Sequence, residues 1–142
     1  MQEIDVNQTI LIVVGIDFKP EEFDRPLGYK IKAAIEESPK CGNHPFRKCI
    51  VISDGLYTND KIIQACPSII IGGPGVNSAA ANLVEKLPVY LSKENRYFIQ
   101  LYDDFKESKI SIWGMDRESS EEAVDTFIAN GLLTDFLDAV WK

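Results

Sequence analysis

The sequence predicts an α/β domain with a mixed sheet, because apolar runs alternate with helical patterns through the first two thirds of the chain. Three runs, at 9–16, 48–53 and 68–72, are apolar almost without interruption. Strands buried on both faces have this composition, and strands separated by helices form parallel sheets. We therefore expect these runs to form the parallel core of a three-layer sandwich.

Helical patterns separate the predicted strands. Proline suits the first turn of a helix, so we expect a helix to start at Pro26, where apolar residues then recur at helical spacing. Another helix is expected to begin at Asn77 or Ser78, which are both good N-terminal caps, and to end at Pro88. A short helix is predicted around Asp60–Ala65.

The second half of the chain contains two strand candidates in close succession. Residues 97–102 and 109–113 are rich in aromatic and β-branched side chains, and only the segment 103–108 separates them. A crossover between parallel strands needs about a dozen residues or more. We therefore expect an antiparallel hairpin, with a further short strand at 89–91 before it.

Two helices are predicted at the C-terminal end. Ser119-Ser-Glu-Glu122 matches a capping box, and Gly131 suits the position after a helix because glycine tolerates positive φ. The last helix, about 132–141, carries an apolar stripe. Such a stripe packs on its own domain or forms the interface of a homodimer, and the sequence leaves both readings open.

Length and charge exclude several classes of protein. The 142 residues suit one α/β domain spanning 1–142. The 22 acidic residues outnumber the 15 basic ones, which argues against binding to nucleic acid or to an anionic membrane surface. No apolar run approaches the roughly 20 residues that span a bilayer. Three cysteines, an odd number, predict reduced thiols and a cytoplasmic location.

The strand–glycine loop–helix pattern over residues 9–90 resembles the general Rossmann-like or flavodoxin-like class of α/β proteins. In such open sheets, ligands bind beyond the carboxyl ends of the parallel strands. The first predicted strand ends in Gly15-Ile-Asp17, the second in Ser53-Asp54-Gly55 and the third in Gly72-Gly-Pro-Gly75. The resemblance implies a fold and a place for a ligand, but it does not imply an activity.

The glycine-rich turn 72–78 is the sharpest candidate site. Gly72, Gly73 and Gly75 would let the backbone approach a ligand closely, and Asn77 and Ser78 open a helix whose N–H groups attract anions. The pattern predicts binding of a phosphate group or a nucleotide. The alternative is a tight structural turn followed by a well-capped helix.

This turn also has a partial match to the dinucleotide fingerprint G-x-G-x-x-G. Gly73, Gly75 and Ser78 stand at its three positions, and Glu94 lies about 20 residues further on, where the fingerprint has an acid for the ribose. Two features depart from the pattern. Pro74 removes a backbone N–H from the turn, and the turn follows the third strand instead of the first.

Acidic and basic side chains at other strand ends are secondary candidates. Asp17 and Asp54 could together hold Mg²⁺ or a ribose hydroxyl, or they could serve as ordinary turn and capping residues. Asp116 and Arg117 follow the last predicted strand, and Arg117 could pair with a phosphate or with a surface carboxylate. Whether they share an edge with the glycine turn depends on the direction of that strand.

A zinc site is the weaker reading of the cysteine pattern. Cys41, His44, Cys49 and Cys66 are four ligand types, but only Cys41 and His44 are close in sequence, whereas structural zinc sites show paired short spacings. No nucleophile–base pair stands out either. We therefore assign no catalytic residue, no metal ligand and no cofactor from the sequence.

Three functions compete at this point. The first is a small-ligand-binding domain that takes a nucleotide or other phosphate-bearing molecule at 72–78. The second is a non-catalytic protein-interaction or assembly domain, which would form a homodimer or larger species and in which the glycine turn is purely structural. The third is a Mg²⁺-dependent hydrolase or transferase that uses Asp17 and Asp54.

Overall fold

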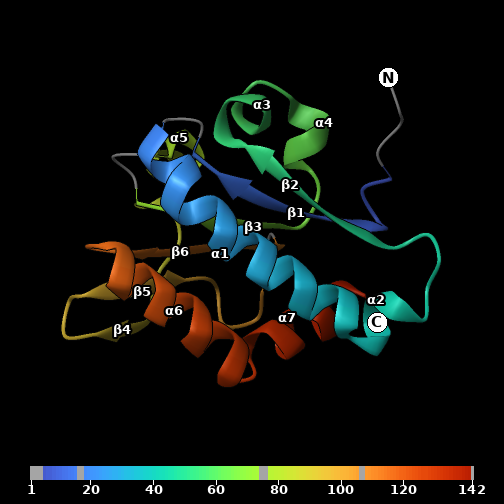
Figure 1. Ribbon diagram of the computed structural model, residues 1–142. Coiled ribbons are helices and arrows are strands. Elements are labelled where there is room, and N and C mark those ends of the chain that lie inside the picture. The colour runs from blue at the N-terminus through green and yellow to red at the C-terminus, as the bar shows by residue number, and fades with distance from the viewer. Residues whose placement is uncertain (1–4, 16–17, 74–76, 106–107, 142) are drawn as a thin grey trace.

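The computed structural model describes residues 5–15, 18–73, 77–105 and 108–141, and its centre is one six-stranded sheet (Figure 1). The strand order is β2-β1-β3-β6-β5-β4. The first four strands are parallel, and β5 is antiparallel to both of its neighbours. The strands are β1 (Thr9–Val14), β2 (Lys48–Ser53), β3 (Ser68–Ile71), β4 (Val89–Lys93), β5 (Tyr97–Gln100) and β6 (Lys109–Gly114). The predicted α/β class and mixed sheet are confirmed.

The strand β1 lies between β2 and β3 and is buried on both faces. Ile10, Ile12 and Val14 pack into the apolar cluster on one side of the sheet, and Leu11 and Val13 pack into the cluster on the other. Successive side chains of a strand point to opposite faces. A central strand with helices on both sides therefore has apolar residues at every position.

The predicted hairpin is confirmed, and its second strand belongs to the parallel core. The strands β5 and β6 pair antiparallel, with Phe98 opposite Trp113. On its other side β6 pairs parallel with β3, with Ile69 beside Ile110. The chain thus passes from β3 to the far edge of the sheet at β4 and returns through β5, so that β6 fills the place next to β3.

Helices cover both faces of the sheet, which makes three layers (Figure 1). One layer contains α1 (Phe18–Glu37), α2 (Pro39–Gly42), α6 (Arg117–Ala129) and α7 (Leu132–Val140). The opposite layer contains the shorter helices α3 (Asp54–Thr58), α4 (Lys61–Gln64) and α5 (Ser78–Leu83). The apolar stripe of α7 is buried in the core through Leu133, Phe136 and Leu137, so it packs on its own domain.

Two helix boundaries differ from the prediction. The helix α1 begins at Phe18, and Pro26 lies inside it. The φ of proline suits a helix, but proline lacks the N–H that would donate to the carbonyl four residues earlier. The cost of this missing hydrogen bond is reduced at an exposed position such as Pro26, where water can take its place. The helix α5 ends at Leu83, before Pro88, although Leu87 is still buried. The predicted short helix is confirmed as α4, with Asp60 as its cap.

The cap of α6 also differs from the prediction. Asp116, not Ser119, is the N-terminal cap, and its carboxylate accepts a 2.7 Å hydrogen bond from the backbone N–H of Ser119. The helix begins earlier because its first turn packs directly against the end of β6 at Gly114. The bond lowers the pKa of the Asp116 carboxyl. This contribution to stability is therefore present above the unfolded-state pKa and is lost as the pH falls through the lowered one.

Shortening a buried side chain in either central strand, β1 or β3, is expected to destabilise the protein strongly. Val13 and Ile70 are neighbours across β1 and β3, and both are fully buried. Replacing either by alanine should lower the free energy of unfolding by roughly 2–4 kcal/mol, through lost transfer energy and a residual cavity. Urea denaturation measures this value. A loss below about 0.5 kcal/mol would contradict the central placement of these strands, since it would be typical of a surface site.

Candidate functional site

The carboxyl ends of the four parallel strands meet at one edge of the sheet. This edge receives Gly15 after β1, Ser53 at the end of β2, Gly72 after β3 and Gly114 at the end of β6. The parallel pairing of β6 with β3 answers the question of strand direction that the sequence left open. Asp116 and Arg117 therefore lie at the same edge as the glycine turn.

A topological switch point lies at this edge between β1 and β3, where the connections from the two strands leave toward opposite faces of the sheet. The chain leaves β1 for α1, which packs on one face, and leaves β3 for α5, which packs on the opposite face. In open α/β sheets, ligands bind where adjacent strands send their connections to opposite faces. Gly15 and Gly72 flank this point.

The two described glycines of the turn have different structural needs. Gly72 has a backbone φ of 113°, a conformation that residues other than glycine rarely adopt. Its N–H donates to the carbonyl of Ile112 at 3.0 Å. At Gly73, an added Cβ would lie 3.4 Å from Cε3 of Trp113, which is ordinary contact. The backbone therefore requires glycine at Gly72 but not at Gly73. Gly75 and Asp17 lie outside the described residues.

Asn77 locks the start of α5 to the sheet. Its side-chain oxygen accepts from the N–H groups of Ala79 and Ala80, as predicted for a cap. Its side-chain nitrogen donates to the carbonyls of Val13 at 3.3 Å and Ile71 at 3.0 Å. The side chain is buried and joins β1, β3 and α5. Its position is thus explained by the fold itself.

Asp54 and Ser78 are brought together, although 24 residues separate them in the chain. Oδ2 of Asp54 accepts from the N–H of Ser78 at 2.8 Å and from its Oγ at 3.1 Å. Asp54 follows β2, so its carboxylate reaches past the end of β1 to the start of α5. A carboxylate is favourable at the N-terminus of a helix. The position predicted for a phosphate already holds a negative charge from the chain itself.

Gln100, which the sequence analysis did not single out, joins Trp113 near the carboxyl edge to the segment that follows α5. Gln100 is buried, donates to the carbonyls of Val84 and Leu87, and accepts a 2.8 Å bond from Nε1 of Trp113. The Trp113 ring stacks on Phe98 with centroids 4.5 Å apart. The signal available in the sequence was the one polar residue, Gln100, in an otherwise apolar strand.

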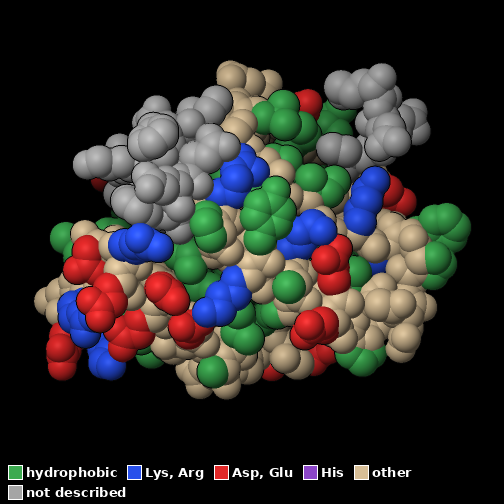
Figure 2. Space-filling model, viewed as in Figure 1, with side chains coloured by type: hydrophobic (Ala, Val, Ile, Leu, Met, Phe, Trp, Pro, Cys, Tyr) green, Lys and Arg blue, Asp and Glu red, His purple; other side chains and the backbone are tan. Residues whose placement is uncertain are grey.

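Cationic side chains lie on the opposite side of the edge, between α1 and α6. A hollow of about 200 Å³ there is lined by Pro26, Leu27, Lys30, Arg117 and Glu121. Lys30 also forms an ion pair with Asp125. On this face of the molecule, acidic and basic side chains are intermixed (Figure 2). The α1–α6 side thus contributes Lys30 and Arg117 together with the acids Glu121 and Asp125, whereas Asp54 lies on the α5 side.

Glu94, the acid of the partial dinucleotide fingerprint, lies far from the glycine turn. It stands in the turn between β4 and β5, at φ of 52°. The strand β4 is three places from β3 in the sheet, which corresponds to about 14 Å at the usual spacing of strands. Glu94 is therefore not placed to bind a ribose held at Gly73.

The cysteines are poorly suited to nucleophilic chemistry. All three are buried, and burial raises the pKa of the Cys49 thiol to about 12. Burial also raises the pKa of Cys41 and of Cys66. His44 is exposed. Within the described ranges, no three His, Cys, Asp or Glu side chains come together as a metal-binding group.

Comparisons with known proteins add no family to this description. Neither the family models nor the curated proteins contain a match for this chain. Within the residues that the structure describes, none of the helices combines the length and the apolar character needed to cross a bilayer.

Proposed function

We propose that this chain is a small-ligand-binding domain whose ligand, a nucleotide or another phosphate-bearing molecule, binds at the carboxyl edge between β1 and β3. The observation that carries the proposal is the switch point itself, where connections from adjacent parallel strands leave toward opposite faces. Gly72 and Gly73 present backbone there without side chains.

The charges at the edge refine where a phosphate would bind. Asp54 occupies the N–H and hydroxyl groups of Ser78, and a phosphate beside it would meet like charge. Lys30 and Arg117 lie on the α1–α6 side. The proposed ligand therefore contacts the glycine backbone at Gly72–Gly73 and directs its anionic group toward Arg117 instead of toward Ser78.

Gly73→Val is expected to abolish binding of the ligand while the fold is kept. The φ of Gly73 does not need glycine, and an added Cβ meets the Trp113 ring at ordinary contact distance, but the valine side chain blocks approach to the backbone. The measurement is a titration of ¹⁵N-labelled protein with inorganic phosphate, ADP and ATP at millimolar concentration. Amide shifts should cluster on Gly72, Gly73 and residues 77–80, together with Arg117.

Gly55→Ala provides the control for this titration. An added Cβ at Gly55 meets nothing within 4 Å, so the variant should bind like the wild type. Urea denaturation of both variants separates a blocked site from an unfolded one. If no shifts cluster on these residues at millimolar ligand, the ligand-binding proposal is wrong.

An interaction or assembly domain is the second candidate, and one observation favours it. The N–H groups of Ser78, Ala79 and Ala80 all donate to oxygens of the chain's own Asp54 and Asn77. A turn satisfied in this way needs no ligand for its stability. This candidate predicts an unchanged spectrum on titration and a homodimer or larger species by light scattering.

Two further expectations, a Mg²⁺-dependent activity and a cytoplasmic location, each have a test of their own. Titration with MgCl₂ tests the hydrolase or transferase hypothesis, in which Asp54 and Asp17 would bind the ion; shifts around Asp54 would support it. A cytoplasmic location is supported by three free, buried cysteines. Cell fractionation tests that location.

A further inference from the structure

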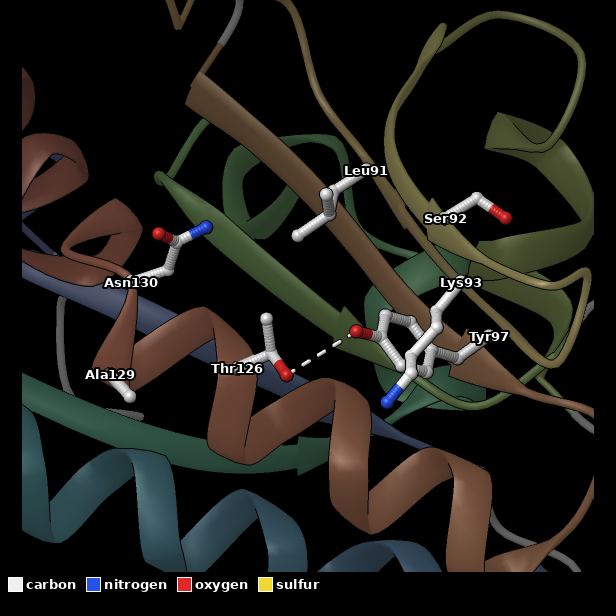
Figure 3. A pocket seen from close by; sticks show the side chains of 7 residues that line it. All are labelled: Leu91, Ser92, Lys93, Tyr97, Thr126, Ala129 and Asn130. Carbon is white, nitrogen blue, oxygen red and sulfur yellow. Dashed lines mark hydrogen bonds between the residues drawn. The ribbon is translucent and has the colours of Figure 1, made fainter.

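A second hollow, away from the proposed ligand site, opens between the edge strand β4 and helix α6 (Figure 3). Its volume is about 520 Å³. Leu91, Ser92 and Lys93 of β4 and Tyr97 of β5 line one side, and Thr126 and Ala129 of α6 and its C-terminal cap Asn130 line the other. Figure 3 shows Leu91 and Lys93 on the side of the hollow and Ser92 pointing away, as the alternation of a strand requires.

The strand β4 is the last strand of the sheet on this side. Within the described residues it pairs with β5 alone, and the register shifts between Val89 and Leu91. Bulges and prolines protect edge strands from indiscriminate pairing, and Pro88 precedes this one. The regular stretch Leu91–Lys93 lies beyond the bulge, and it is this stretch that borders the hollow.

The hollow has an apolar part and a charged end. Leu91 is only half-buried, Ala129 is small, and the hydroxyls of Tyr97 and Thr126 lie 3.3 Å apart. At the charged end, Nζ of Lys93 lies 2.8 Å from Oε1 of Glu122, and Arg96 lies 3.3 Å from Oε2 of the same carboxylate. Both cations contact Glu122, and Arg96 also interacts electrostatically with Asp116.

We propose that an extended peptide segment of a partner protein adds to the edge of β4 and places two side chains in this hollow. A strand paired with Leu91–Lys93 has every second side chain on the side of α6. An apolar side chain would pack beside Leu91, and an acidic one, two residues away, would meet Lys93 and Arg96. Opposite charges across paired strands are stabilising, and the half-exposed Lys93 side chain is accessible to an acid on the added strand.

The partner is therefore defined by its chemistry. It is an extended segment with an apolar residue and an aspartate or glutamate at positions i and i+2, in either order. This inference does not depend on the proposed ligand site, because it uses the lateral edge strand β4 and residues that take no part in the ligand proposal.

The test is selection of peptides from a phage-displayed random heptapeptide library on the immobilised domain. Ala129→Arg fills the hollow from an exposed helix position, so it should preserve the fold and weaken binding of a selected synthetic peptide about tenfold or more. Ala81→Arg, the same change on exposed α5 on the other face, should bind like the wild type. Lys93→Met should remove the preference for an acidic residue and retain the apolar one.

Amide shifts on adding the selected peptide locate its binding site. Shifts at Leu91–Lys93 and Thr126–Asn130 support the proposal, and shifts elsewhere overturn it. A library that yields no peptides, or peptides that Ala129→Arg binds equally well, also overturns it. If the wild type dimerises by light scattering and Ala129→Arg does not, a second copy occupies the hollow and the partner proposal is wrong. None of these outcomes affects shifts at Gly72–Ala80, which report on the ligand proposal alone.

Discussion

Gly114→Ala is expected to lower the free energy of unfolding by about 3 kcal/mol or more. An alanine Cβ there would lie 2.6 Å from the carbonyl carbon of Ser119 and closer still to the backbone nitrogen of Ser120. These atoms belong to the first turn of α6 and cannot rotate away as a side chain would. The N–H of Gly114 also donates to Oγ of Ser120 at 3.1 Å. The end of β6 and the start of α6 must therefore move apart to make room for the methyl group of alanine.

Two other glycines provide controls for this measurement by urea denaturation. Gly55→Ala meets no atom within 4 Å and lies in a helix, so it should be neutral or stabilising by up to about 1 kcal/mol. Gly131→Ala also meets nothing but has φ of 84°, so it should cost about 1 kcal/mol from backbone strain. If Gly114→Ala costs no more than Gly131→Ala, the close packing of α6 on β6 is wrong.

Asn77→Ala is expected to lower the free energy of unfolding by about 3 kcal/mol. The loss of the cap contributes about 1 kcal/mol, since the N–H groups of Ala79 and Ala80 lose their acceptor. The remainder comes from the buried carbonyls of Val13 and Ile71, which lose their donor without gaining water. Thermal and urea denaturation both measure the effect.

Asn77→Ser separates the two contributions. Serine is about as good a cap as asparagine, but it has no amide to donate to the strand carbonyls. We expect a cost of about 2 kcal/mol, intermediate between the wild type and Asn77→Ala. A serine variant as stable as the wild type would mean that the bonds to β1 and β3 contribute nothing, and that Asn77 acts only as a cap.

These two residues bear directly on the candidate site. Gly114 fixes where α6 begins, and therefore where Arg117 stands at the carboxyl edge. Asn77 holds the start of α5 against the ends of β1 and β3. Mild variants at either position should therefore alter binding of the proposed ligand through the geometry of the edge.

Patterns that are local in sequence predicted much of this fold. The apolar runs of β1 and β3 predicted strands buried on both faces, because only such a strand needs apolar residues at every position. For β2 the prediction was right about the parallel strand and wrong about its burial: β2 is an edge strand, and Cys49 is its one buried residue. The short spacing between β5 and β6 predicted their antiparallel pairing, because no crossover fits in it. Asn77 and Ser78 were the two predicted caps, because capping involves residues two and three positions away, and the structure shows that Asn77 is the cap.

What depended on contacts between distant segments was decided only by the tertiary structure. The parallel pairing of β6 with β3 brought Arg117 to the edge of the glycine turn, and no spacing along the chain specifies it. Asp54 meets Ser78 because β2 and β3 lie on either side of β1, which brings the segments that follow these two strands close together at one edge. The sequence by itself determined which segments are strands, whereas several predicted strand ends, such as those of β1, β4 and β5, differ from the structure. Which polar groups meet at those ends depends on strand order, a property of the packed sheet.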